Sequence, residues 1–285
     1  MSFLPARVCL IAAILCSSAI ALIMRFFRQA DNRYGMLEGN YLTCSLIGFL
    51  MIGNSTALLY CDTSTVFLGV MGGFFYLISL VCMQTGIRTN GAILTSAFGK
   101  LGLVVPLLLS ILFFHETPGI LHAAGLLFVI AAVWTISGGS SETEVKKPWF
   151  LVVVLLTSGA ADAMAKVFNV FGIASQSSEY FFLIFFSAAL CTLVLLYLET
   201  KKTGKRASLR DYLSGVLVGI PNYFSSVFLL QALSGIPAYI AYPVFSTGTI
   251  LFVTLVSALF FHERPTRRQL AGLIMILAAL ILLNI

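Results

Sequence analysis

The sequence predicts an all-helical integral membrane protein of ten transmembrane helices, arranged as two inverted repeats of five helices each. Three observations predict this fold class. Of the 285 residues, 59% are hydrophobic and only 10% are charged, more apolar than a soluble core of this size requires. The apolar residues fall into runs of about 20, the length of a membrane-crossing helix. A gap-free internal repeat relates the two halves of the chain. A soluble enzyme is excluded.

Polar and proline-containing breaks separate the apolar runs and set the ends of the predicted helices. Pro118 and Pro265 each stand at the first turn of a helix, where proline is best tolerated. The first run is too long for a signal-peptide core and has no basic lead beyond Arg7, so we expect it to remain as a span. The predicted spans are 4–24, 34–54, 65–87, 91–113, 118–137, 149–171, 180–198, 212–233, 237–260 and 265–284.

The internal repeat appears when the chain is shifted by 147 residues without gaps. The stretch Ser110 to Pro118, with Phe-Phe-His-Glu-Thr-Pro, then falls on Ser257 to Pro265, with Phe-Phe-His-Glu-Arg-Pro. Polar residues also match at this offset, which chance does not produce between apolar helices. These further matches pair Gly72 with Gly219, Tyr76 with Tyr223, Ser79 with Ser226 and Gln84 with Gln231.

The repeat divides the chain into a first five-helix unit at 1–137, a cytoplasmic linker at 138–148 and a second five-helix unit at 149–285. Because five is odd, the second unit crosses the membrane in the opposite sense to the first. Inverted repeats of this kind are typical of transporters that expose one site alternately to the two sides of a membrane.

The basic residues of the predicted loops indicate the orientation, since Lys and Arg collect in cytoplasmic loops. One side of the predicted membrane holds nearly all of them, and the other holds only Arg7. The rich side, predicted to be cytoplasmic, carries Arg25, Arg28, Arg33, Arg88, Lys146, Lys147, Lys201, Lys202, Lys205, Arg206, Arg210, Arg264, Arg267 and Arg268. Ten spans then place both termini outside the cytoplasm.

Charges inside spans are costly, so each is a functional hypothesis. Lys100 lies near the middle of its span, and its repeat mate is Thr247, so this charge is not a symmetric feature of the architecture. Asp162 lies near the middle of the sixth span, with Lys166 one turn later. One interpretation is a structural pair between Asp162 and Lys166, or Lys166 reaching toward the interface. The other is that Asp162 faces Lys100 across a cavity, where a proton or a substrate breaks the contact.

Glu38, near the cytoplasmic end of the second span, is expected to neutralise nearby arginines or Lys100 rather than to bind substrate. Other polar and aromatic residues are predicted either to line a cavity or to hydrogen-bond between helices. Pro221 is a predicted kink beside them. With Lys100 and Asp162, the predicted substrate-binding set is Tyr76, Tyr223, Gln84, Gln231, Asn222, Tyr242, Thr247 and Phe98.

The sequence predicts ten spans in two repeats. Each repeat has Phe-Phe-His-Glu-x-Pro between its fourth and fifth spans and Ala-Gly-Leu in its fifth. This pattern resembles the EamA-type members of the drug/metabolite transporter superfamily. The matching residues are Glu116 with Glu263 and Gly125 with Gly272. The resemblance implies a ten-helix basket around a central cavity, and termini in the cytoplasm, contrary to the distribution of charge. Small multidrug relatives use a glutamate in the first span, where this chain has Leu15 to Ser18, so their proton exchange does not transfer.

The predicted function is therefore a secondary active transporter, an exporter or exchanger of a small polar or amphiphilic organic metabolite, in the plasma (inner) membrane. The alternatives are a proton-coupled exporter of cationic drugs or amines and, more remotely, a membrane scaffold. No enzymatic activity and no cofactor are expected, and the scattered cysteines indicate neither a metal site nor a disulfide. The expected partners are the solute, the bilayer and, for coupling, protons, but no nucleic acid. The chain is expected to be a monomer or a homodimer.

Overall fold

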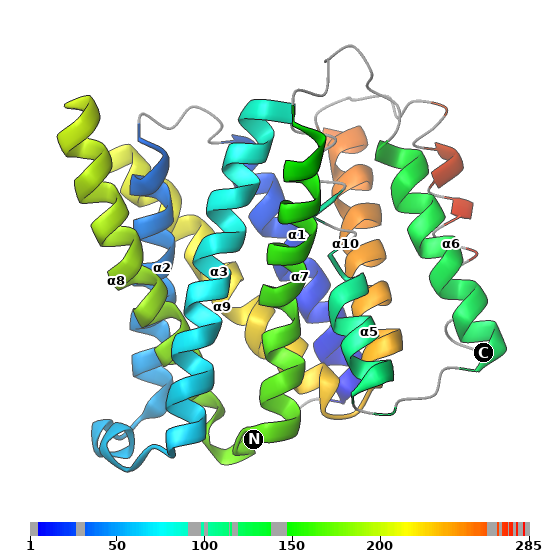
Figure 1. Ribbon diagram of the computed structural model, residues 1–285, viewed down its shortest axis with the longest axis horizontal. Helices are drawn as coiled ribbons and strands as arrows, with labels where there is room; N and C mark the ends of the chain where they lie inside the picture. Colours follow the sequence, from blue (N-terminus) through cyan, green and yellow to red (C-terminus); the bar gives the residue numbers. More distant parts are fainter. Residues whose placement is uncertain are drawn as a thin grey trace.

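The structure is a computed structural model, which describes residues 5–26, 32–90, 98–99, 102–113, 115, 119–137 and 147–260, with isolated positions between 267 and 282. The described elements are helical (Figure 1). In chain order they are α1 (Ala6–Phe26), α2 (Arg33–Ile52), the 3-10 helix η1 (Ser55–Tyr60), α3 (Thr63–Asn90), α5 (Val104–Leu112), α6 (Ile120–Ser137), α7 (Pro148–Phe171), the 3-10 helix η2 (Ala174–Gln176), α8 (Ser177–Thr203), α9 (Leu209–Leu233) and α10 (Ala238–Phe260).

Six helical stretches among the described residues are long and apolar enough to cross a membrane. They are Ala6–Met24, Tyr34–Ile52, Thr63–Gly86, Trp149–Phe171, Ala174–Thr203 and Leu209–Leu233, and α10 adds a shorter apolar stretch, Ala238–Val253. About 20 apolar residues span a hydrocarbon core. The chain is a multi-pass integral membrane protein, as its composition predicts.

The helices run alternately up and down between two faces of the bundle (Figure 1). At one face α2, α7 and α9 begin, the exposed Lys201 lies in the last turn of α8, and the exposed Lys205 and Arg206 lie between α8 and α9. We call this the basic face. At the other, the opposite face, α1, α3, α8 and α10 begin, and Arg7 is exposed. The predicted spans 4–24, 34–54, 65–87, 118–137, 149–171, 180–198, 212–233 and 237–260 agree with the observed helices to within five residues at each end.

Side-chain caps fix the starts of several helices at the predicted breaks. Asn32 accepts the amide of Tyr34 at the start of α2, and Ser208 and Asp211 form a reciprocal capping box at the start of α9. Before α3, the carboxylate of Asp62 accepts the amide and hydroxyl of Ser64, and these bonds hold the pKa of Asp62 below its usual value. Each cap satisfies amides that a helix leaves unpaired at its N-terminus.

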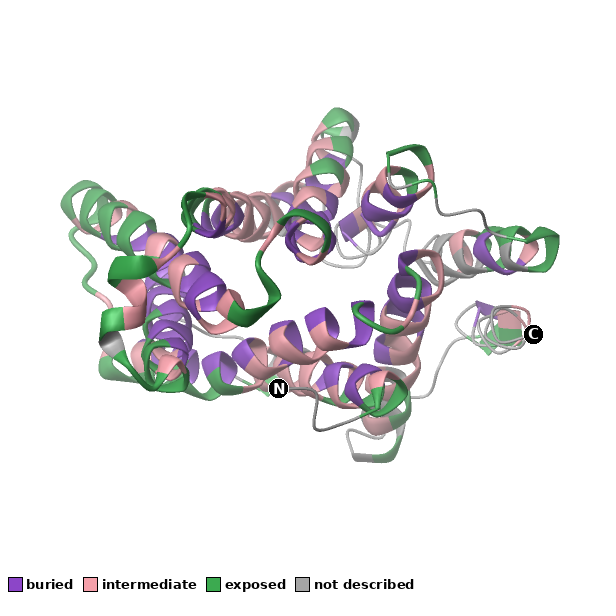
Figure 2. Cartoon of the chain, turned by 90° about the horizontal axis from the view of Figure 1, so that it is seen from below, coloured by how far each residue is buried: buried purple, intermediate pink, exposed green. Residues whose placement is uncertain are grey.

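The helices of the two halves of the chain interlock. Helix α2 packs between α8 and α9, α1 packs on α9 and α10, and α3 packs on α7 and α8. Seen along the bundle, buried residues face the interior and exposed residues the periphery and helix ends (Figure 2). The apolar side chains on that periphery, such as Leu46 at 60% and Leu193 at 52% exposed, are those that lipid would cover.

Glycines allow α2 and α9 to cross almost at backbone contact. A Cβ atom on Gly39 would lie 2.6 Å from the carbonyl oxygen of Tyr212, and one on Gly215 would lie 2.4 Å from that of Met36. Any side chain larger than hydrogen would separate the helices. Small residues four apart, as with Gly215 and Gly219, are the usual device for this close packing in membranes.

Candidate functional site

A cavity of about 240 Å³ lies inside the bundle. Its walls come from α1, α2, α3, α7, α9 and α10, that is, from both halves of the chain. It is lined by Ser17, Ile20, Met24, Met36, Leu37, Asn40, Tyr76, Ser79, Leu80, Met83, Gly99, Ser158, Ala161, Asp162, Ala165, Val218, Asn222, Ser225, Ser226, Leu229, Phe245 and Ser246. A water molecule occupies about 30 Å³ of liquid, so this space fits a small solute.

The cavity lies around the middle of the membrane. Asp162, the 15th of the 24 residues of α7, marks its middle level. The lining residues of α1, from Ser17 to Met24, and of α2, from Met36 to Asn40, lie in the halves of these helices nearer the basic face. Those at 225–229 on α9 and at 245–246 on α10 lie in the halves nearer the opposite face. On the side of the opposite face, the interior is filled by aromatic side chains.

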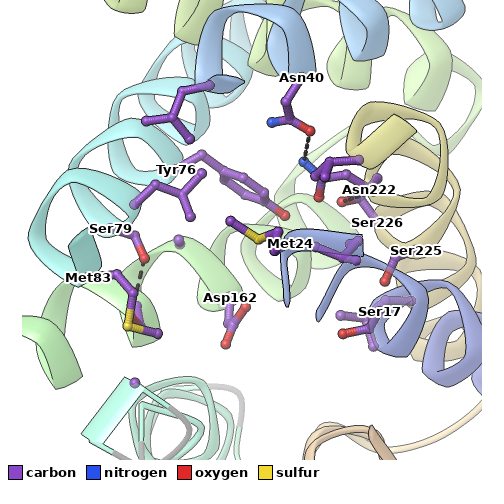
Figure 3. A pocket seen from close by; sticks show the side chains of 18 of the residues that line it. Ser17, Met24, Asn40, Tyr76, Ser79, Met83, Asp162, Asn222, Ser225 and Ser226 are labelled. Atoms are coloured by element: carbon purple, nitrogen blue, oxygen red, sulfur yellow. Dashed lines mark hydrogen bonds between the residues drawn. The ribbon is translucent and has the colours of Figure 1, made fainter. Parts of the chain in front are cut away.

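Two asparagines join α2 and α9 at the wall of the cavity. The Asn222 amide nitrogen donates to the side-chain oxygen of Asn40 at 3.0 Å, and both side chains are close to Tyr76 in Figure 3. Asn40 is 2% exposed, so its amide needs a partner inside the protein. Each asparagine side chain can make more hydrogen bonds than this one, so the pair keeps donors and acceptors that a solute could use.

Asp162 points into the cavity from α7, across from Tyr76 and Asn222 (Figure 3). It is the acidic residue of the described lining. The hydroxyl of Tyr242, on α10, donates to the backbone carbonyl of Asp162 at 2.8 Å. Tyr242 is therefore a neighbour of the cavity that fixes the backbone beneath the carboxylate.

Serine hydroxyls supply most of the remaining polarity. Ser79 donates to Ser158 at 3.2 Å across the α3–α7 interface, and Ser225 donates to the carbonyl of Ala13 on α1 at 3.2 Å. Ser226 bonds within its own helix, to the carbonyl of Asn222 at 3.1 Å. A hydroxyl can both donate and accept, so these groups can also bond a polar solute.

The predicted substrate-binding residues separate into two groups. Tyr76, Asp162 and Asn222 line the cavity. Tyr223 lies instead in an aromatic core, with its ring centroid 6.0 Å from that of Phe181. The other predicted residues with described positions also lie outside the lining: Gln84, Gln231, Tyr242, Thr247 and Phe98.

Two of these other residues have hydrogen-bond partners outside the cavity, and one has no described partner. Gln231 accepts the thiol of Cys9 at 3.4 Å. Thr247 donates back to the carbonyl of Pro243 in its own helix. The side-chain oxygen of Gln84 is buried, and no described group donates to it.

The predicted charged residues are also spread out. Lys166 is buried one turn below Asp162 on α7, at 7% exposure. Glu38 is 2% exposed and lies outside the cavity lining, and no described group bonds its oxygen Oε2. Lys100, Glu116 and Glu263 lie outside the described residues, although Gly99, next to Lys100, lines the cavity.

Several lining residues did not stand out in the sequence, foremost Asn40, Ser17, Ser158 and Ser225. Asn40 had a signal, a lone amide inside an apolar run, but its repeat mate is Ser187, so the repeat did not mark it. Serines are too common in membrane helices to be informative alone. Ser79 and Ser226, matched across the repeat, are the exception, since both line the cavity.

The described residues hold no group of three His, Cys, Asp or Glu side chains that could bind a metal ion. The functional groups of the site are amides, hydroxyls, thioethers and one carboxylate. This set suits the binding of an organic solute by hydrogen bonds and charge.

The chain is similar to known proteins over most of its length. An uncharacterized protein of Haemophilus influenzae is 25% identical over 286 residues, covering 95% of each chain. A protein crystal structure superposes with a TM-score of 0.74 at 16% identity, covering 98% of this chain and 96% of that one, and so shares its fold. The model of the EamA-like transporter family matches residues 149–285. This match over residues 149–285 agrees with the resemblance to drug/metabolite transporters that the sequence motifs indicate.

Proposed function

We propose that the protein is a secondary active transporter that moves a small polar or amphiphilic organic metabolite by alternating access. The observation that carries the proposal is a cavity at mid-membrane depth, lined by polar and apolar side chains with a single carboxylate among the described ones, and enclosed by helices of both halves. Membrane proteins keep a charged group at such depth where it faces a cavity or a partner. The volume of about 240 Å³ is below the ~300–1,000 Å³ of pockets for drug-sized ligands, which favours a small solute.

The proposal includes the two inverted five-helix repeats, with units at 1–137 and 149–285. Shifting by 147 residues carries α1 onto α7, α2 onto α8 and α3 onto α9. The members of each pair run in opposite directions (Figure 1). The contacts also exchange under the shift, since α1 packs on α9 as α7 packs on α3, and α2 packs on α9 as α8 packs on α3. These correspondences support a two-fold axis in the membrane plane.

A second candidate is a proton-coupled exporter of cationic amines. Asp162 supports it, because it is the one charged side chain in the described lining of the cavity and a carboxylate attracts a cation. The position of Lys100 decides between the two candidates. A lysine beside Gly99 would give the cavity both charges and suit an acidic or zwitterionic solute, with transport driven by exchange or by protons.

The test is thermal unfolding of the purified full-length protein with amino acids, nucleobases, polyamines and lipophilic cations. A solute that binds the folded state stabilises it by mass action, by about 2.7 kcal/mol at 100 times its Kd. We expect an acidic or zwitterionic solute to stabilise the protein, and Lys100→Ala and Asp162→Asn to abolish both this shift and uptake into proteoliposomes. Lys147→Ala and Glu179→Gln, which change charges outside the cavity lining, are the matched controls.

The second candidate would replace the first if a cation stabilises the protein, and if this stabilisation persists in Lys100→Ala but is lost in Asp162→Asn. Full uptake by Asp162→Asn would remove this carboxylate from both mechanisms. If no solute of the panel shifts the unfolding temperature and none is taken up, the proposed range of substrates is wrong.

A further inference from the structure

Side-chain hydrogen bonds join the turn between α9 and α10, Ser234–Pro237, and the ends of the two helices that flank it to α1 and α7. The Tyr242 hydroxyl donates to the carbonyl of Asp162 on α7 at 2.8 Å. The Asn169 amide, at the end of α7, donates to the hydroxyl of Ser234 at 3.3 Å. The Cys9 thiol on α1 donates to Gln231 at the end of α9 at 3.4 Å. All three bonds lie between the level of Asp162 and the opposite face.

The same region is also held by close packing. A Cβ atom on Gly235 would lie 2.9 Å from that of Ala6, so the turn lies directly against the start of α1. Ala238 and Ala241, in the first turn of α10, are both 0% exposed. The turn and the first turn of α10 are therefore closely packed against the start of α1 and inside the bundle.

An aromatic layer lies between Asp162 and the opposite face. The rings of Phe168 and Tyr180 stack with centroids 3.8 Å apart, and both are at most 2% exposed. The hydroxyl of Tyr180 donates to the carbonyl of Met164 at 3.0 Å. Hydroxyls from α8 and α10 thus bond two carbonyls of α7, those of Asp162 and Met164, next to the cavity.

The repeat mate of Gln231 provides a contrast. Gln84 occupies the matching position on α3, near the basic face, and its buried side-chain oxygen has no described donor. Gln231 has its contact with α1. Among the described residues, the two repeat-related glutamines thus differ in their contacts.

We propose that the α9–α10 turn is the closed gate of the cavity on the opposite face, and that Tyr242 is a positioning residue linking this gate to the backbone of Asp162. The inference rests on the proposed transport function and deepens it. Lifting the turn away from α1 and α7 must break the Tyr242 bond, which frees the carbonyl beneath the carboxylate. A solute that displaces α7 at Asp162 loosens the same bond, so occupancy of the cavity favours opening of the gate.

The test is the reactivity of a cysteine at Ala241 with a membrane-impermeant maleimide applied to the opposite face. The six native cysteines are first replaced, so that only the introduced cysteine reacts. Cys9 is replaced by serine, whose hydroxyl can still donate a hydrogen bond to Gln231, as the thiol does. Tyr242→Phe and Asn169→Ala should each raise labelling of Ala241→Cys about fivefold, the shift that loss of one neutral hydrogen bond produces. The matched control is Tyr41→Phe, which removes a hydroxyl bonded to the carbonyl of Tyr76, away from the turn.

Unchanged labelling in both gate variants, or an equal rise in the Tyr41→Phe control, would overturn the gate. Thermal unfolding of each variant checks that increased labelling comes from a folded protein. A second reporter, Ala165→Cys in the cavity lining, should lose reactivity from the basic face as Ala241→Cys gains it. If labelling of Ala241→Cys rises while that of Ala165→Cys does not fall, the gate is supported and alternating access is contradicted. The two proposals can therefore fail separately.

Discussion

Asn40 and Asn222 show at the scale of single residues how the cavity keeps polar groups inside a membrane. An amide without a partner in an apolar interior costs a few kcal/mol, and each of these two residues supplies part of what the other needs. Because the bond joins α2 to α9, it also holds together the two halves of the chain at the wall of the cavity. The same residues thus contribute to the site and to the fold.

This bond can be measured with a double-mutant cycle. Asn40→Ala and Asn222→Ala should each destabilise the protein, and the double variant should lose less than the sum, with a coupling of about 0.5–1.5 kcal/mol as for other interhelical bonds in membranes. Denaturant unfolding in mixed micelles gives the free energies. Asn40→Ala with Ser246→Ala removes two lining groups without this bond and should be additive. Additivity in both cycles would show that the asparagine contact contributes nothing.

Three of the residues that the sequence singled out line the cavity, and their role in binding stays a prediction. Tyr76, Asp162 and Asn222 were identifiable because a charge, an amide beside a proline or a repeated tyrosine is unusual in an apolar run. Tyr223 has the same signal as Tyr76 but packs among phenylalanines. The repeat fixes the helix on which a residue lies, whereas the rotation of that helix depends on its neighbours, and these differ between the two halves.

At the scale of helices, the crossing of α2 and α9 depends on backbone contact. Gly215→Ala should destabilise the protein by about 1–3 kcal/mol, because its methyl group would meet the backbone of Met36 and Asn40, which cannot move independently of α2. Helix propensity works the other way, since alanine is favoured over glycine by about 1 kcal/mol. Unfolding free energies in micelles measure the balance.

Gly248→Ala on α10 is the matched control for this substitution. Its methyl group would lie 2.7 Å from Ile14 Cδ1, the end of a flexible side chain that can turn away. It gains the same helix propensity without a backbone collision, so its stability should stay near that of the parent or rise. Equal effects of the two substitutions would contradict a crossing set by backbone contact.

The helices themselves followed from the sequence because apolar length and polar breaks determine them almost alone. Predicted span 212–233 and α9, Leu209–Leu233, differ by the first turn, which the Ser208–Asp211 capping box adds. α8 runs to Thr203, past the predicted end at 198, because Lys201 and Lys202 continue the helix until Gly204 ends it in a left-handed conformation. Of the predicted span 91–113, the structure describes 98–99 and 102–113, which include α5 (Val104–Leu112), and the predicted span 265–284 falls largely outside the described residues.

At the scale of the whole molecule, two arguments about orientation disagree. The distribution of charge places the basic face in the cytoplasm and both termini outside it, whereas the resemblance to EamA-type transporters implies cytoplasmic termini. Positive charge in short loops sets orientation during insertion. The loop between α8 and α9 is short and carries exposed Lys205 and Arg206, while Arg7 is the basic residue expected at the other side.

Two exposed loop positions at opposite faces test this orientation. Leu59, 83% exposed in η1, lies at the opposite face, and Lys205 lies at the basic face. In a background without other cysteines, Leu59→Cys should react with an impermeant maleimide in intact cells. Lys205→Cys should react only in inside-out vesicles, because the charged loop stays in the cytoplasm. The reverse pattern would place the termini in the cytoplasm, as the family resemblance implies, and would make the α9–α10 turn the cytoplasmic gate.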